Sequence, residues 1–125
     1  MNNLTGEIVD VAIKIQKVLG PGLFESVYEE IMFYELAKRG LIVERQVAIP
    51  VHYEAVKMDV GFRADLVIEK EIIVELKSIE VVKPVHKKQV ITYLRLTNNK
   101  IGLLINFNEE LLKNGITRLY NNHVR

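Results

Sequence analysis

The fold of this chain is decided by the stretch GFRADLVIEKEIIVELK, residues 61–77. Two runs rich in Val, Ile and Leu flank three charged residues at 69–71, and this pattern predicts strands at 63–69 and 71–78 joined by a tight hairpin turn. The run Ile72-Ile73-Val74 is apolar on both faces, which places the second strand in the centre of a sheet.

Helices and further strands are expected on both sides of this hairpin. Apolar residues spaced three and four apart predict a first helix ending at Leu19, with Thr5 as its N-cap. The remaining patterns predict helices at 25–39 and 84–96, strands at 42–52, 57–62, 101–107 and 116–120, and one helical turn at 109–112. The order of elements favours a mixed α/β fold built on one sheet.

Composition limits the class of protein. The chain has 125 residues, which predicts one domain spanning 1–125, and its hydrophobic content of 49% is that of a globular protein. A net charge of +1 restricts any contact with nucleic acid to a local patch. The sequence has no cysteine, no apolar run of membrane-spanning length and no signal-peptide pattern, so we expect a cytoplasmic protein without a membrane partner.

Three charged residues in the hairpin form a candidate site. In a hairpin centred on Lys70, residues whose numbers sum to about 140 face each other, so Asp65 is expected opposite Glu75. Lys77 lies two residues beyond Glu75 and shares its face of the strand. Carboxylates on directly opposed residues lie close enough to repel each other, so they need a cation between them. Mg²⁺ prefers carboxylate oxygens as ligands.

This residue set is the one that metal-dependent hydrolysis of a phosphodiester requires. The carboxylates hold the ion, which acidifies a water and offsets charge on the phosphate. Lys77 is either a general base with a pKa lowered by burial or an electrostatic stabiliser. A structural cluster at a solvated sheet edge is the alternative, but the apolar run that leads into Glu75 speaks against it.

Motifs along nearly the whole chain carry a resemblance to a known family. They are Gly22-Leu23-Phe24-Glu25-Ser26-Val27-Tyr28, Arg63-Ala64-Asp65-Leu66, Glu75-Leu76-Lys77, Pro84-Val85-His86, Gln89-x3-Tyr93-Leu94 and Gly102-Leu103-Leu104-Ile105-Asn106-Phe107. Taken in this order, they resemble the GxxExxY proteins, a branch of the PD-(D/E)XK nuclease superfamily. The sequence has Ala64 where the name of the superfamily has Pro.

The resemblance implies a restriction-endonuclease-like core, which is an α/β fold with a mixed central β-sheet flanked by α-helices, and it implies a set of roles. Asp65 and Glu75 would be metal ligands for Mg²⁺ or Mn²⁺, and Lys77 would be the catalytic lysine. Glu25 would be the acidic residue on a helix that helps to hold the metal. Gln89 and Tyr93 resemble a Gln-x3-Tyr motif that lies near the active site in recombination-type exonucleases. From the residues alone, the favoured interpretation of Glu25 is an acid stabilised by the helix dipole at a helix start.

The third predicted helix lies in a basic part of the sequence. Residues 81–108 contain five Lys and Arg residues and no acidic residue. His86, Lys87 and Lys88 are therefore candidates to contact phosphates, and a solvated helix face is the alternative. A surface or structural role is equally open for His86, and Tyr28 and Tyr93 fit core aromatics with a hydroxyl at the rim.

Three functions remain open at the level of the sequence. The first is a metal-dependent nuclease that acts on DNA or RNA. The second is a nuclease-fold module, weakly active or inactive, that binds nucleic acid or a protein partner. The third is a metal-dependent hydrolase or binder for a small phosphorylated ligand. The apolar segments 101–107 and 116–120 fit a homodimer interface, although their place in a core explains them equally well.

Overall fold

The computed structural model describes residues 3–123, and the side chains of all of these except residues 59 and 60. The helices are α1 (Asn3–Leu19), α2 (Glu25–Lys38), α3 (Pro84–Thr97) and the short 3₁₀ helix η1 (Leu112–Gly115). The strands are β1 (Val43–Tyr53), β2 (Val56–Ile68), β3 (Ile72–Lys77), β4 (Ile101–Asn106) and β5 (Ile116–Tyr120). None of the described helices is long and apolar enough to cross a bilayer.

All five strands join one mixed sheet, in which their spatial order follows the chain, β1-β2-β3-β4-β5. The pair β3–β4 is parallel, with α3 as its crossover, and the other three pairs are antiparallel. The predicted α/β fold with a mixed central sheet is therefore confirmed. β3 is the middle strand of this order, as its doubly apolar sequence indicates.

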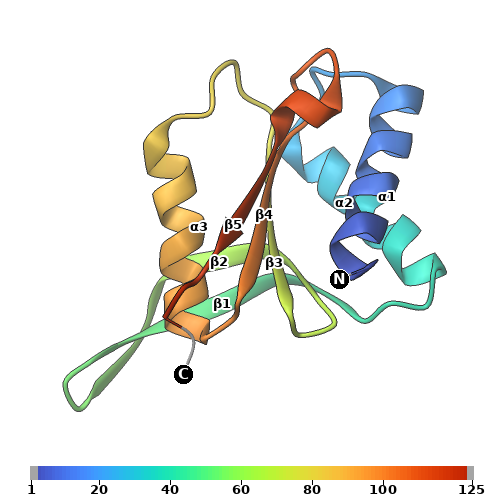
Figure 1. Ribbon diagram of the computed structural model, residues 1–125. Helices are drawn as coiled ribbons and strands as arrows, with labels where there is room; N and C mark the ends of the chain where they lie inside the picture. The colour runs from blue at the N-terminus through green and yellow to red at the C-terminus, as the bar shows by residue number, and fades with distance from the viewer. Residues whose placement is uncertain (1–2, 124–125) are drawn as a thin grey trace.

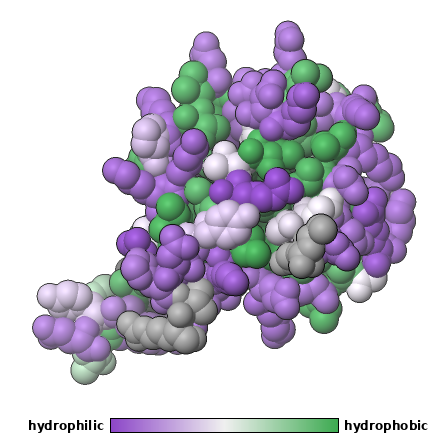
Figure 2. Space-filling view, viewed as in Figure 1, coloured by the Kyte–Doolittle hydropathy of each residue, from purple (hydrophilic) through white to green (hydrophobic). Residues whose placement is uncertain are grey.

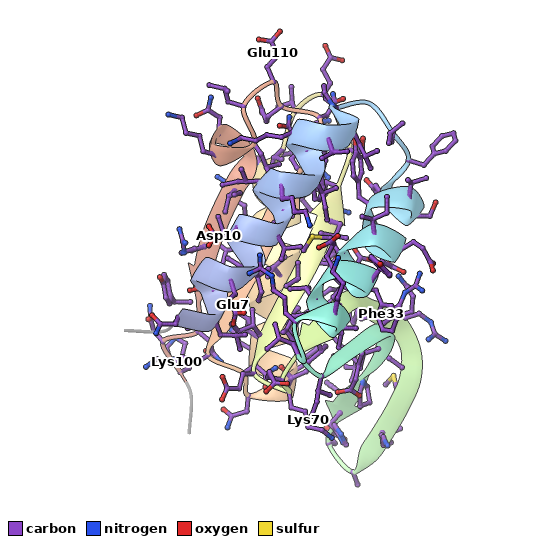
Figure 3. All side chains as sticks on the ribbon, turned by 90° about the vertical axis from the view of Figure 1, so that its right-hand side faces the viewer. Glu7, Asp10, Phe33, Lys70, Lys100 and Glu110 are labelled. Carbon is purple, nitrogen blue, oxygen red and sulfur yellow. The ribbon has the colours of Figure 1, made fainter. Side chains whose placement is uncertain are left out.

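Helices cover both faces of the sheet (Figure 1). α1 and α2 lie side by side on one face, as Figure 3 shows, and they bury apolar side chains against alternate residues of β2, β3 and β4. α3 lies on the opposite face and packs on a smaller apolar cluster that includes Ile73. Gly102 permits this close packing, because a Cβ at that position would lie 2.7 Å from Val90 Cγ1.

The β2–β3 hairpin has the register that the sequence predicts. Ile68 pairs with Ile72, Val67 with Ile73 and Leu66 with Val74, so paired residue numbers sum to 140. Glu69 and Lys70 have left-handed φ angles of 53° and 56°, and this conformation closes the turn.

One strand replaces two that the sequence predicts. We expected a break between 57–62 and 63–69, but β2 continues from Val56 to Ile68. The β1–β2 register shifts between Ile49 and Val51, where Pro50 cannot donate to the ladder. Gly61 lies in the part of β2 that faces this register shift. Its φ of 110° accommodates the shift, so β2 continues without a turn. The β1–β2 hairpin projects from the body as an arm (Figures 1 and 2).

Two local predictions are wrong. Thr5 is not an N-cap, because α1 already includes Asn3, and the Thr5 side chain is buried within the helix. The helical turn expected at 109–112 forms later, as η1. The 109–111 segment instead accepts hydrogen bonds from α1, since Gln16 Nε2 donates to the carbonyl oxygens of Glu109 and Glu110. Glu110 lies beside the C-terminal end of α1 in Figure 3.

Candidate active site

Asp65 and Glu75 meet at the point where the β2–β3 ladder ends. Beyond the Leu66–Val74 pair, each carboxylate accepts a hydrogen bond from the backbone of the opposite strand. The backbone N–H of Asp65 donates to Glu75 Oε1 at 2.9 Å, and the backbone N–H of Leu76 donates to Asp65 Oδ2 at 2.8 Å. The two acidic side chains therefore take the place of ladder hydrogen bonds and are held by the strands themselves.

The surroundings of Asp65 and Glu75 make it unfavourable for both side chains to be ionised at once. The Glu75 side chain is buried, with 4% of the residue exposed. Burial, reinforced by the charge of Asp65, raises the pKa of Glu75 to about 8. Burial also raises the pKa of Asp65, and the charge of Glu29 adds to this effect. An added cation would stabilise the ionised form of both groups.

Lys77, at the end of β3, is the basic residue of that strand. Its charge lowers the pKa values of Asp65 and Glu75, although burial outweighs this contribution at both positions. Within residues 3–123, its ammonium forms no direct ion pair with a carboxylate. The Lys77 side chain is half-buried at the end of the strand, so it lies beside the acidic pair without neutralising it.

Glu25 reaches the same end of β3 from the first turn of α2. Its Oε2 accepts a hydrogen bond of 3.0 Å from the backbone N–H of Ser78, the residue after Lys77. The charge of Glu25 contributes to the raised pKa of Glu75, so the two carboxylates lie near each other. Glu25 thus ties the start of α2 to the carboxyl end of the central strand.

Tyr28, the last residue of the Gly22–Tyr28 motif, has a structural role. It is fully buried and its ring stacks on Phe107 at 4.2 Å between centroids. Its hydroxyl donates to the carbonyl oxygen of Gly20 at 2.6 Å and accepts from the backbone N–H of Leu23 at 3.2 Å. The structure thus supports a core aromatic with its hydroxyl at the rim, which fixes the loop before Glu25.

Gln46 is a site residue that the sequence analysis missed. Its Nε2 donates to Glu29 Oε1 at 2.6 Å and to Asp65 Oδ1 at 3.2 Å. Its φ of 49° is left-handed, which is rare for Gln inside a strand and typical of backbone held in place at functional sites. Gln46 therefore joins α2 to the acidic pair through one amide group.

Glu29 completes this connection. It is buried on α2 and its Oε2 accepts a hydrogen bond of 3.0 Å from Arg45 Nη2. The same guanidinium lies 2.9 Å from Glu30 Oε2, and the hydrogen bond to Glu29 raises the pKa of Arg45. The spacing of four between Glu25 and Glu29 places both on one helix face and is the signal that could have found Glu29.

Tyr93 and Gln89 lie on α3. Tyr93 is buried and meets Phe62 edge to face, with ring centroids 5.4 Å apart. Burial and the charges of Glu75 and Asp65 raise the pKa of Tyr93 to about 12, which shows that its hydroxyl lies near the acidic pair. Gln89 is half-buried one turn earlier on the helix.

The three candidate phosphate-contacting residues lie at the start of α3. His86 Nδ1 accepts a hydrogen bond of 2.9 Å from the backbone N–H of Lys83, so one ring nitrogen caps the helix. Lys87 and Lys88 are exposed, and neither forms an ion pair with any described residue. The structure thus gives His86 a structural contact and leaves two cations on the surface of α3.

Asn106, at the end of β4, holds the segment that follows β3. Its side chain is fully buried, accepts from the backbone N–H of Ile79 at 3.1 Å and donates to the carbonyl oxygen of Ile79 at 2.9 Å. The backbone N–H of Phe107 also donates to the carbonyl oxygen of Lys77. A polar residue inside an otherwise apolar run is the signal for this role.

The acidic residues can be tested for their fit to a divalent metal. Among the described residues, no three His, Cys, Asp or Glu side chains form a ready-made metal cluster. Asp65 and Glu75 are nevertheless two buried acids with raised pKa values, and they offer only oxygen donors. Mg²⁺ and Mn²⁺ accept such ligands, and Mg²⁺ is commonly bound through one or two carboxylates and waters. The donor set fits a hard divalent cation.

Comparison with known protein families identifies a superfamily for the chain. A sequence model of the PD-(D/E)XK nuclease superfamily matches residues 2–119, almost the entire chain. No curated protein and no solved structure matches the chain. The matched range includes both strands that carry the acidic pair and the whole of all three α-helices. The chain therefore belongs to the PD-(D/E)XK nuclease superfamily.

Proposed function

We propose that this protein is a metal-dependent nuclease that hydrolyses phosphodiester bonds of DNA or RNA. One observation carries the proposal: Asp65 and Glu75 are brought together across β2 and β3, with Lys77 at the end of the same strand. Membership of a nuclease superfamily supports the reaction class. The fold alone would not establish the reaction class, because one fold supports many functions.

In this proposal the acidic residues hold the metal and Lys77 acts on the substrate. Asp65 and Glu75 would bind Mg²⁺ or Mn²⁺, with Glu25 as a third ligand or as a partner of a metal-bound water. The ion would supply positive charge for the phosphate and an acidified water. Lys77 would stabilise charge on the phosphate or accept a proton from the attacking water.

The α3 residues would act around this centre. Tyr93 is buried near both carboxylates, and its hydroxyl would fix their orientation or a bound water. Gln89, one turn before it, would face the same side. Lys87 and Lys88, together with Nε2 of His86, would attract the phosphate backbone.

Finer assignments rest on the motifs. The Gly22–Tyr28 motif supports placement in the GxxExxY branch, and its Glu and Tyr have separate roles, one at the site and one in the core. A chain without cysteine suits a reducing compartment, so the cytoplasm is the proposed location. A homodimer would bring two sites onto one nucleic acid.

Cleavage of plasmid and of labelled oligonucleotides tests the proposal. We expect cutting with Mg²⁺ or Mn²⁺ and none with a chelator. Lys77→Ala and Glu75→Ala should each lower the rate by a factor on the order of 1,000, because each removes several kcal/mol of transition-state stabilisation. Glu71→Ala and Lys113→Ala are matched controls, since both side chains are exposed and lie away from the acidic pair.

The alternative is a nuclease-fold module that binds nucleic acid or a protein partner without cutting. The lack of a ready-made three-ligand cluster among the described residues favours this alternative. Binding of DNA or RNA that neither the metal nor the two substitutions alter would support the module and exclude the nuclease.

A further inference from the structure

A hollow beside the candidate active site has no role in the proposal above. Its volume is about 510 Å³, which lies in the range of pockets for small molecules. It is lined mainly by Leu23, Phe24, Glu25, Ser26, Ser78 and Asn108. Two of these, Glu25 and Ser78, are joined by a hydrogen bond next to Lys77, so the hollow adjoins the catalytic end of β3.

The hollow lies where α/β proteins usually bind ligands. Ser78 follows β3 and Asn108 follows β4, and the carboxyl ends of these two parallel strands share one edge of the sheet. The loop between α1 and α2 lies at this same end of the molecule (Figure 1). Three separate segments of the chain therefore build the hollow.

Phe24 is the most exposed large apolar residue among those that line the hollow. Its side chain is 82% exposed, the highest value among the exposed large apolar residues described. Leu23 and Val27 are also exposed beside it, so an apolar surface continues around the ring. A Phe in this position gains almost nothing from burial in the folded protein, because most of its surface stays in water.

The loop presents Phe24 in a fixed position. The buried Tyr28 hydroxyl bonds to Gly20 at one end of the loop and to Leu23, next to Phe24, at the other. Gly20 and Gly22 have φ values of 76° and 93°, so each turns the chain in a conformation that other residues rarely adopt. These contacts hold the backbone next to Phe24, so the loop presents the ring toward solvent at a fixed place.

Two polar side chains line the same hollow as the ring. Ser78 and Asn108 form their hydrogen bonds through backbone nitrogens. Among the described residues, their side chains have no hydrogen-bond partner, which leaves a hydroxyl and an amide for a ligand. An aromatic face combined with hydrogen-bonding groups is the chemistry that recognises a nucleobase, which has a flat π-face and a polar edge.

We propose that this hollow binds an unpaired nucleobase, which stacks on Phe24 and places its edge toward Ser78 and Asn108. The inference rests on the proposed function, because it identifies the substrate as a strand with unpaired bases next to the cleaved phosphate. A base in a duplex is stacked and paired and cannot present its face to the ring. Single strands and unpaired ends of DNA or RNA share the required chemistry.

Binding in the presence of a chelator tests the proposal without the need for catalysis. Fluorescence anisotropy of the full chain would compare labelled single-stranded DNA, single-stranded RNA, duplex DNA and a single strand of DNA with abasic sites. Phe24→Ala should weaken binding of the intact single strands by about 5-fold to 100-fold, the range expected for one base–aromatic stack. The abasic strand should bind wild type and Phe24→Ala equally.

Three further variants separate stacking from general apolar contact. Phe24→Trp should restore single-strand binding, whereas Phe24→Leu keeps an apolar side chain without a ring and should behave like Phe24→Ala. Tyr34→Ala is the matched control, because this exposed aromatic of α2 lies about 15 Å further along the helix. All these side chains are exposed, so the variants should fold and melt like wild type.

The outcomes are distinguishable from failure of the nuclease proposal. Selective loss of single-strand binding in Phe24→Ala supports the base pocket even if the protein cuts no substrate with Mg²⁺ or Mn²⁺. Equal binding by wild type and Phe24→Ala overturns the pocket even if the protein is an active nuclease, and it would assign the surface to a protein partner. Equal losses for duplex and single strand, or full binding by Phe24→Leu, also overturn it. The DNA and RNA arms show which strand the pocket accepts.

Discussion

The two faces of the central sheet differ in what they bury. Toward α1 and α2, β3 and β4 present only apolar side chains, among them Val74, Leu76 and Leu103. Toward α3, the intervening residues of the same strands include Glu75, Lys77 and Asn106. Strand alternation thus separates stability from chemistry within two six-residue strands. A change on one face should therefore affect folding and a change on the other should affect the site.

The largest expected effect is on the apolar face. Leu103 is fully buried and lies beside Val74 in the parallel register. Leu103→Ala should lower the free energy of unfolding by about 2–5 kcal/mol, from lost burial and the cavity that remains. Urea denaturation measures this change. Leu111→Ala is the control, because that side chain is exposed, and equal effects of both substitutions would contradict the contrast between the faces.

On the α3 face, the expected effect is a dependence of stability on pH. Glu75 keeps its proton up to about pH 8 in the native state, whereas the unfolded chain loses it near the usual value of 4.5. The native state therefore binds more protons across this window, and the free energy of unfolding should fall as pH rises from 4.5 to 8. Asp65, whose pKa is also raised, acts in the same direction. The loss should be on the order of a few kcal/mol.

Melting temperatures at pH 5 and pH 8 check this expectation. Glu75→Gln should flatten the decrease, and Mg²⁺ or Mn²⁺ should reverse part of it in wild type, because a cation stabilises the ionised pair. Glu71→Gln, in the exposed turn of the same hairpin, should leave the profile of wild type unchanged. A Glu75→Gln variant with the pH profile of wild type would show that Glu75 is not the group that titrates.

The smallest of the three effects concerns Gln46, which links the site to α2. Gln46→Ala should lower the cleavage rate about 10-fold, the lower end of the range for residues that orient metal ligands. It should also raise the metal concentration needed for half-maximal cutting, because Asp65 loses one of its two hydrogen bonds. Glycine readily adopts the left-handed φ of 49° found at this position, so Gln46→Gly removes the side-chain amide and keeps the backbone conformation. Full activity in Gln46→Gly would rule out a role for the amide.

The hairpin and its acidic pair could be predicted from the sequence because their causes are local. The turn at Lys70 fixes the register, and the register fixes which residues face each other across β2 and β3. Period-two alternation then gives the face of Glu75 and Lys77. The match to the superfamily agrees with the motifs quoted along the chain. The helices at 25–39 and 84–96 were likewise predicted to within one residue at their ends.

The rest of the site depends on tertiary structure. Gln46 reaches Asp65 only because of an unusual φ in β1, and no pattern in 42–52 marks it. Glu29 meets Gln46 across the α2–β1 contact, which no spacing in the sequence specifies. The continuous β2 escaped prediction for a similar reason. Gly61 in isolation is typical of a break, and only its neighbour Pro50 across the ladder explains why the strand continues.

The two side-chain hydrogen bonds that end the β2–β3 ladder have a spectroscopic consequence. The amide protons of Asp65 and Leu76 each point at a carboxylate oxygen of the opposite strand. Their NMR chemical shifts should follow the charge on those oxygens, since hydrogen bonds to ionised acceptors are shorter and stronger. Two ordinary backbone amides thus serve as built-in indicators of protonation and ion binding, without any label at the site.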